Sequence, residues 1–202
     1  FTGSDRKTVE AEAKAWQAGM AAFDDNIDTT VSEAYNRYIS SKEKVLSPST
    51  IRNYKKMQCN NFQSIMGIRV DRLTEEQIQR AVNELSARRS PKTVRNNYGL
   101  LTAVLGMFRP KFSPNIQLPQ REKKDIYIPT KTELKMLLEK SKGTGYYLPI
   151  LLAATCGMRA GEICALTSDD IHGSKINVNK SLVCNDKGQW LIKQPKSYAG
   201  YR

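Results

Sequence analysis

The sequence predicts a mainly α-helical protein with two domains, in which four helices are followed by a smaller α+β region. Three observations lead to this fold class. Helix start signals precede apolar stripes of helical period in residues 29–109. Four prolines then interrupt residues 110–129. Near the end, alternating apolar residues on both sides of a turn predict a pair of strands.

The helices of the first domain each have a recognisable start. After a separate helix over residues 5–23, a first helix is expected over residues 30–44. Ser47-Pro48 opens the second helix and Ser90-Pro91 the fourth, because serine caps well and proline is tolerated in the first turn. Thr74 to Gln77 is a capping box that opens the third. The expected inward residues are Val31, Ala34, Tyr35 and Tyr38; Ile51, Tyr54, Phe62 and Ile65; Ile78, Ala81, Val82 and Leu85; and Val94, Tyr98, Leu101, Leu105 and Phe108.

The second domain is predicted to begin at Thr130, which forms another capping box with Glu133. Leu134, Leu137 and Leu138 are expected to face inward. A nearly all-apolar stretch over residues 146–156 predicts a buried helix, and a short helix follows over residues 162–166. Residues 175–183 then read as one strand, residues 185–188 as a turn and residues 189–193 as a returning strand.

Charge is the first indication of function. The chain carries a net charge of +12, of which residues 29–109 contribute +8. A basic domain of this size suits a polyanion such as nucleic acid, although a basic protein without such a partner is the plainer interpretation. No apolar run reaches the roughly 18 residues of a membrane span, and no signal peptide opens the chain. Because it also lacks an initiator methionine, we expect it to begin inside a longer protein.

Cysteine usage argues against a metal site and against disulfides. None of Cys59, Cys156, Cys164 and Cys184 forms a C-x-x-C pair, and His172 is the sole histidine. The first three cysteines lie in apolar helical patterns and are expected to be buried. The sequence therefore predicts no metal and no cofactor, and a reducing cytoplasm is the default compartment.

The polar faces of the second and fourth helices predict a surface for DNA. Both combine cations with amides, and their N-termini offer free N–H groups to phosphates. Ordinary solvated faces of a helical bundle would look the same. The candidate DNA-binding residues are Ser49, Thr50, Arg52, Asn53 and Lys56; Lys92, Thr93, Arg95 and Asn96; and, in the linker, Arg121, Lys123 and Lys124.

Residues 153–166, Ala-Ala-Thr-Cys-Gly-Met-Arg-Ala-Gly-Glu-Ile-Cys-Ala-Leu, are the most specific stretch of the chain. Arg159 stands between an apolar helix and a short amphipathic one, and a guanidinium can hold two phosphate oxygens at once. Gly157 and Gly161 are expected to let the backbone turn tightly and to leave room for a ligand beside it. The alternative is that Arg159 forms a salt bridge with Glu162, which would then be a plain helix-pair carboxylate.

This stretch resembles the first catalytic box of the tyrosine recombinases, T-G-[LM]-R-x-G-E-[LI]-x-x-L, with Cys156 in place of the usual Thr. Residues 167–171 look like the family's [RKT]-W-x-D-I segment, with Ser168 in place of Trp. Residues 90–94 resemble its S-P-K-T-V. Residues 195–197 resemble its P-K-[TS] hairpin, which implies that Lys196 donates a proton to the 5′ leaving oxygen. Lys193 is the competing candidate, and Glu162 would brace Arg159.

The resemblance implies a domain organisation. Residues 1–28 would be the closing helix of an arm-binding domain with its linker, and residues 29–109 a four-helix SAM-like core-binding domain. A basic proline-rich linker over residues 110–129 would lead to the first half of an α+β catalytic domain over residues 130–202. Arg202 falls where the hairpin's later arginine should be.

The family's H-x-x-R box and nucleophilic tyrosine have no counterpart in these residues. His172 is followed by Gly-Ser-Lys in a turn, and Tyr198 and Tyr201 are too close to Lys196 in sequence to be the nucleophile. We therefore expect an incomplete chain that binds DNA but forms no covalent adduct.

The resemblance as a whole implies an integrase of a phage or transposon, which cleaves and rejoins DNA through a 3′-phosphotyrosine without metal or ATP. Its partners would be duplex DNA at core sites, other protomers as a dimer on DNA and a tetramer in the synapse, and accessory DNA-bending proteins, in the bacterial cytoplasm and with no membrane. The alternatives are a non-enzymatic, sequence-specific DNA-binding regulator, which leaves the Arg159 box unexplained, and a helical interaction module, which also leaves the charge unexplained.

Overall fold

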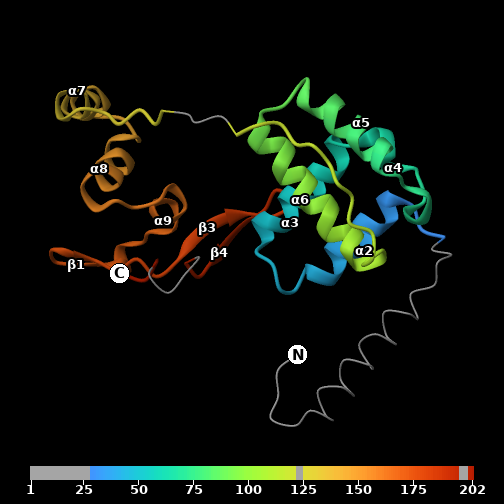
Figure 1. Cartoon of the computed structure of the whole chain (residues 1–202). Coiled ribbons are helices and arrows are strands. Elements are labelled where there is room, and N and C mark those ends of the chain that lie inside the picture. The colour runs from blue at the N-terminus through green and yellow to red at the C-terminus, as the bar shows by residue number, and fades with distance from the viewer. Residues whose placement is uncertain (1–27, 122–124, 196–199) are drawn as a thin grey trace, which may run out of the picture. The chain divides into compact units, whose positions relative to one another are not determined.

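The computed structural model describes residues 28–121, 125–195 and 200–202 (Figure 1). The chain divides between Glu122 and Lys123 into two compact units, and this division falls within the segment that the prolines interrupt. We call residues 28–121 the helical unit and the described residues from 125 onward the C-terminal unit. The helix expected over residues 5–23 lies outside the described residues.

The helical unit confirms the mainly α-helical fold class. Its elements are α2 (Val31–Lys42), α3 (Pro48–Asn60), α4 (Gln63–Met66), the 3₁₀ turn η1 (Val70–Arg72), α5 (Glu75–Ser86) and α6 (Pro91–Phe108). The start signals of α5 and α6 act as the sequence predicts, whereas Ser47 precedes Pro48 at the start of α3 but makes no side-chain cap bond and its hydroxyl bonds that of Ser49. The Thr74 hydroxyl accepts from the Gln77 amide, the Gln77 side chain accepts from the Thr74 amide, and the Ser90 hydroxyl caps α6. Thr30 and Glu33 add a capping box to α2.

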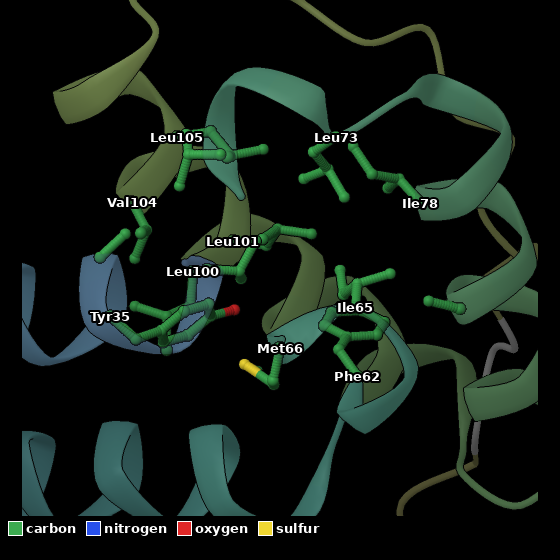
Figure 2. Close-up of a cluster of buried hydrophobic side chains, with 14 of the residues drawn as sticks. Tyr35, Phe62, Ile65, Met66, Leu73, Ile78, Leu100, Leu101, Val104 and Leu105 are labelled. Carbon is green, nitrogen blue, oxygen red and sulfur yellow. The ribbon is translucent and has the colours of Figure 1, made fainter. Parts of the chain in front are cut away.

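One hydrophobic core fills the helical unit (Figure 2). The predicted inward residues of α5 are all buried, and those of α6 are buried except for Tyr98, which is half-buried. A polar pair lies among them: the amide of Asn61 donates to the Asn97 side chain at 2.8 Å, and Asn97 donates to the Thr93 carbonyl. The Asn61 Oδ1 atom is buried without a hydrogen-bond partner, so the pair is only partly satisfied, yet its one direct bond still favours a single alignment of the end of α3 with α6.

The second predicted helix is broken, which corrects the expectation of one run through Ile65. α3 ends at Asn60, and Phe62 takes a left-handed conformation with φ of +57° before α4 begins. Asparagine is a poor helix-interior residue, and here Asn61 bonds Asn97 instead of continuing the helix. Gln63 then donates to the carbonyls of Gln58 and Asn61, which satisfies acceptors at the end of α3.

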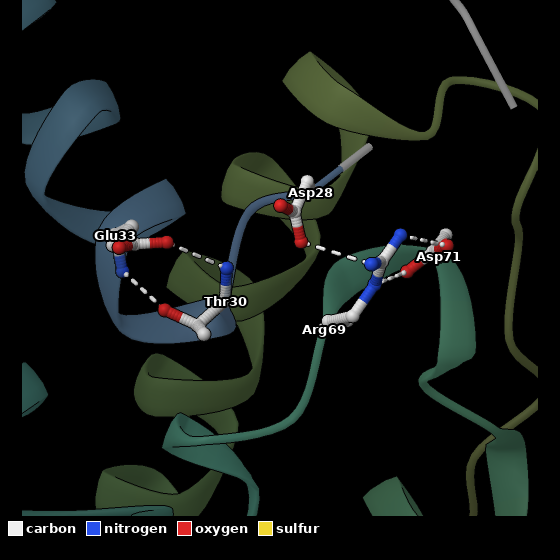
Figure 3. A network of polar contacts seen from close by, with 5 residues as sticks. All are labelled: Asp28, Thr30, Glu33, Arg69 and Asp71. Carbon is white, nitrogen blue, oxygen red and sulfur yellow. Dashed lines mark hydrogen bonds and ion pairs between the residues drawn. The ribbon is translucent and has the colours of Figure 1, made fainter. Parts of the chain in front are cut away.

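The start of the helical unit is fixed by ion pairs (Figure 3). The Arg69 guanidinium donates from Nη1 to Asp28 at 2.9 Å and, through Nε and Nη2, to both oxygens of Asp71. The paired guanidinium lowers the pKa of Asp71. Backbone bonds from Val31 to Ile68 and from Val70 to Thr29 join the same two segments. The entry of the chain into α2 is therefore tied to the loop before η1.

The first part of the predicted linker packs on the helical unit although it has no regular structure. Phe112, Ile116 and Leu118 lie against the core. The Gln79 side chain accepts from the Gln117 amide and donates to its carbonyl, as a neighbouring strand would. The prolines exclude helix and sheet from this segment, but the segment still packs against the helical unit.

The C-terminal unit contains α7 (Lys131–Ser141), α8 (Tyr147–Cys156), α9 (Ala160–Ala165), η2 (Ser168–Asp170) and the strands β1 (Ile171–His172), β2 (Lys175–Ile176), β3 (Ser181–Cys184) and β4 (Trp190–Lys193). β1 pairs with β2 and β3 with β4, both antiparallel, with Cys184 opposite Trp190 and Ser181 opposite Lys193. The predicted turn and returning strand are present. The single strand expected over residues 175–183 is wrong, because residues 177–180 separate β2 from β3.

Burial in this unit is lower than the sequence predicts. Its core consists of Leu152, Met158 and Val178 with a few partly buried neighbours. Leu137, expected to face inward, is 48% exposed, and of the apolar helix α8 only Leu152 is buried. Cys59 in the helical unit and Cys156 and Cys164 here are also exposed, contrary to expectation. The apolar pattern of α8 predicts a helix that packs against other apolar residues, and the described residues of this unit provide few of them. No helix of the described residues is long and apolar enough to cross a membrane.

Candidate functional site

The turn between α8 and α9 presents Arg159. Gly157 ends α8 with φ of +62°, a conformation that favours glycine, and Met158 is buried beside it. Arg159 follows with extended backbone as the residue before α9. Its side chain is 72% exposed. The box thus anchors its backbone in the small core and directs one guanidinium toward solvent.

Glu162 is the buried partner of this arginine. Its Oε2 accepts from the Arg159 backbone N–H at 2.9 Å, and its Oε1 accepts from Arg159 Nη1 at 2.9 Å. The salt bridge weighed as an alternative for Arg159 therefore exists. It orients the guanidinium through one nitrogen and leaves most of the side chain exposed, so it is compatible with a bracing role for Glu162.

A second arginine reaches the same carboxylate. Arg202 donates from Nη2 to Glu162 Oε2 at 2.8 Å and to the Gly157 carbonyl at 3.2 Å. Burial alone would raise the pKa of Glu162, but the hydrogen bonds from Arg159 and Arg202 outweigh it and lower the pKa overall. Glu162 is therefore a carboxylate that two guanidinium groups share.

Gly161 has a different role from the one expected. A Cβ at this position would lie 2.6 Å from the Ser181 hydroxyl and 2.9 Å from the Leu182 carbonyl. The space beside Gly161 is thus filled by β3 rather than left for a ligand, which corrects the sequence-based interpretation. The tight turn predicted for Gly157 is present, whereas Gly161 allows β3 to approach the start of α9.

A second ion pair secures the segment that leads to β3. Lys180 donates to Asp170 at 2.7 Å and to the Thr167 hydroxyl at 3.0 Å, while Asp170 accepts from the Thr167 backbone N–H. The hydrogen bonds from Lys180 and Thr167 hold the pKa of Asp170 far below its usual range. Asp170 is buried at the end of η2, and its pair with Lys180 joins η2 to the residue before β3.

The hairpin residues are only partly described. Lys196 and Tyr198 lie outside the described residues. Lys193, the competing lysine, is half-buried at the end of β4 opposite Ser181. His172 is exposed in β1 opposite Lys175, and Tyr201 is 42% exposed.

The candidate DNA-binding residues of α3 lie on its surface. Ser49, Arg52, Asn53 and Lys56 are exposed and Thr50 is half-buried. The bond between Asn61 and Asn97 fixes the end of α3 against the first half of α6.

On α6, Lys92 and Asn96 are exposed and Thr93 is half-buried. Arg95 is half-buried because its Nε donates to the Pro119 carbonyl at 3.0 Å, so this cation also holds the packed linker. Gly99 and Gly106 have open space around them, as a smooth helix face requires. Arg121 is exposed, and Lys123 and Lys124 lie outside the described residues.

Two features of the site were not predicted. The sequence aligns Arg202 with a family arginine but assigns it no contact, and it gives Lys180 no role. Among residues 28–121, 125–195 and 200–202, no group of three or more His, Cys, Asp or Glu side chains is placed to hold a metal ion.

Residues 30–86 match the family model described as the phage integrase N-terminal SAM-like domain. No curated protein matches the sequence. The fold is similar to that of the Tn1549 transposon integrase in complex with transposon right-end DNA, with a TM-score of 0.70 and 19% identity over 86% of this chain and 60% of that one. Two complexes of the same integrase with circular intermediate DNA give TM-scores of 0.71 and 0.70 at 18% and 20% identity. The chain spans about three fifths of the length of these structures.

Proposed function

We propose, from the premise that residues 30–86 form a phage integrase SAM-like domain, that this chain is part of the tyrosine recombinase of a mobile genetic element. The complete enzyme would cleave and rejoin DNA at specific sites. The observation that carries the proposal is the Arg159 box: an exposed guanidinium oriented by a buried carboxylate, in a chain whose fold is that of a transposon integrase.

Arg159 would bind the phosphate that is transferred. A guanidinium holds two oxygens in a fixed geometry and stabilises the negative charge that develops on them. A tyrosine oxygen attacks phosphorus, the bond to the 5′ oxygen breaks, and Lys196 gives that oxygen a proton. The products are a 3′-phosphotyrosine and a 5′ hydroxyl. Because one phosphoester replaces another, the step needs no ATP.

The tyrosine and the second arginine of this reaction would come from residues outside these 202. The sequence contains no H-x-x-R box, and the matched integrases are longer than this chain by a wide margin. This chain alone would therefore bind DNA without forming a covalent bond to it. A partial set of catalytic groups that act as a unit is expected to give no partial activity.

The helical unit would provide the core-binding grip. Its exposed cations on α3 and α6 suit the phosphates of duplex DNA, and Arg121 is a further exposed cation of this unit. Lys123 and Lys124 follow it in the sequence and would also bind DNA. Residues 29–109 would be the core-binding domain and residues 130–202 the first half of the catalytic domain. Other protomers and DNA-bending proteins would complete the assembly in the bacterial cytoplasm.

Covalent trapping on nicked DNA tests this function. A complete recombinase that contains this sequence should leave a protein–DNA band that survives denaturation, when the label is on the DNA segment 5′ to the cleaved bond, which keeps the 3′ phosphate. The 202-residue chain should shift the same DNA on a native gel yet leave no such band. If the complete protein binds DNA but never forms the covalent band, it is a DNA-binding regulator instead.

A covalent band from the chain alone that is lost in Tyr198→Phe or Tyr201→Phe would contradict the assignment of the nucleophile to other residues.

A further inference from the structure

Arg202 connects three parts of the C-terminal unit. Its guanidinium bonds Glu162 on α9 and the carbonyl of Gly157 at the end of α8. Its backbone exchanges hydrogen bonds in both directions with Val178, which is buried in the small core. The chain that returns after the hairpin is thus fixed against the box that carries Arg159.

The bonds to Glu162 explain why a buried carboxylate is tolerated there. The residue is 4% exposed, so its charge must be met by donors. Arg159 supplies a backbone N–H and Nη1, and Arg202 supplies Nη2. Without the Arg202 side chain, the buried Glu162 carboxylate is bonded by Arg159 alone. We expect it then to hold the backbone N–H and the Nη1 of Arg159 less firmly, because the bonds of a buried network support one another.

We propose that Arg202 is a positioning residue for Arg159, which it orients through the Glu162 carboxylate that the two arginines share. This inference rests on the proposed function, because it deepens the role of the same site. Arg202 bonds protein groups rather than substrate in this structure, whereas 72% of the Arg159 side chain is exposed. The two arginines therefore have different roles. Arg159 binds the phosphate, and Arg202 holds the Glu162 carboxylate that orients Arg159.

A purely structural role for Arg202 predicts different behaviour. Its backbone bonds to Val178 do not depend on the side chain, so Arg202→Gln preserves them while removing the guanidinium. Both side-chain bonds of Arg202 come from Nη2, so Arg202→Lys preserves a positive charge and a nitrogen that can donate to both acceptors, but on a shorter side chain. Lys175→Gln is the matched control, because it removes one exposed positive charge from the same unit.

The first test uses the 202-residue chain and requires no catalysis. Nitrogen NMR of arginine side chains detects slow rotation of a guanidinium that is held by an ion pair. The Arg159 signals, assigned with Arg159→Lys, should show this restriction in the original chain and lose it in Arg202→Gln. They should be unchanged in Lys175→Gln. Arg159 signals that stay equally restricted in Arg202→Gln would overturn the inference.

The second test measures strand cleavage by the complete recombinase. Losing a partner one step removed from the reacting group typically costs about 10-fold or more, by analogy with residues that orient metal ligands. Arg202→Gln should lower the cleavage rate by about 10-fold with DNA affinity unchanged, and Arg202→Lys should restore part of it. An equal loss in both variants, accompanied by a fall in melting temperature, would show a merely structural role.

If the unaltered enzyme does not cleave, the proposed function fails while the NMR test still decides the coupling.

Discussion

The two units of this chain are stabilised by different kinds of contact. The helical unit has a core of twenty buried hydrophobic residues, capped helices and a packed linker segment. The described residues of the C-terminal unit have a core cluster of three, with Ala165 also buried, and ion pairs of Glu162 and Asp170 hold the turn before α9 and the segment before β3. Apolar burial is the main source of stability in the first unit, whereas in the second unit polar contacts fix the positions of a few side chains. Under the proposed function, DNA binding and catalysis would therefore rest on supports of different kinds.

The largest expected effect concerns the helical unit as a DNA-binding surface. If its cations contact some 6–10 phosphates, the affinity of the chain for duplex DNA should fall by about 10³–10⁵ between 50 and 200 mM salt. Fluorescence anisotropy with a labelled duplex measures this directly. An affinity indifferent to salt would remove the electrostatic role assigned to α3 and α6.

A core substitution tests the contrast in packing. Leu101 of α6 is fully buried in the core of the helical unit, so Leu101→Ala should destabilise this unit by about 3 kcal/mol. Leu152→Ala should cost less, because the smaller core around it is more open to solvent. Urea unfolding followed by amide NMR reports each unit separately. Equal losses in both units would contradict the proposed difference.

Acid should act on the C-terminal unit first, because its small core contributes less stability than the core of the helical unit, in which the pKa of Asp71 is also lowered. The pKa values of Glu162 and Asp170 are lowered in the folded chain, so their stabilisation is present above the ordinary carboxyl pKa near 4 to 4.5 and is lost as the pH falls below it. Trp190 in β4 reports this unit by fluorescence once Trp16→Phe removes the other tryptophan. Its transition should precede the loss of helical signal in circular dichroism.

In Asp170→Asn, which leaves Lys180 without its carboxylate, the unit should be less stable at neutral pH and its acid transition should be less steep. An unaltered profile would argue against this ion pair as a source of stability.

The smallest expected effect tests which cations of the chain bind DNA. Replacing Lys92 and Arg95 together with Ala should weaken DNA binding about 10-fold and reduce its salt dependence, because two phosphate contacts are lost. Lys140 and Lys142 of α7 serve as the matched pair, with little expected effect. Because Arg95 also bonds Pro119, Lys92→Ala alone separates loss of a cation from release of the linker. Equal effects of both pairs would refute this surface.

Local signals in the sequence predicted the helical unit well. Capping boxes and apolar stripes depend on neighbours three or four residues apart, so the burial of Ile78, Ala81, Val82 and Leu85 could be read directly. The break at Phe62 could not, because it depends on the contact of Asn61 with Asn97, 36 residues away. The apolar periodicity places Phe62 on the inward face whether or not the helix is broken, so it does not reveal the break.

The site was predicted in part for the same reason. The box identifies Arg159 and Glu162, which are three residues apart, whereas Arg202 reaches Glu162 across 40 residues. Gly161 was interpreted as space for a ligand, since the sequence does not show that β3 occupies that space. Residues 177–180 interrupt the predicted strand where Lys180 bonds Asp170, another contact that no local pattern specifies.

The central claim is that Arg159 serves phosphoryl transfer rather than folding, and Arg159→Lys in the complete recombinase tests it most directly. Lysine keeps the charge but loses the two-pronged grip on phosphate, so strand cleavage should fall by roughly 10²-fold or more, as for loss of one transition-state donor. The melting temperature should change little, because the side chain is largely exposed. A large fall in melting temperature with cleavage intact would show that Arg159 is a structural residue.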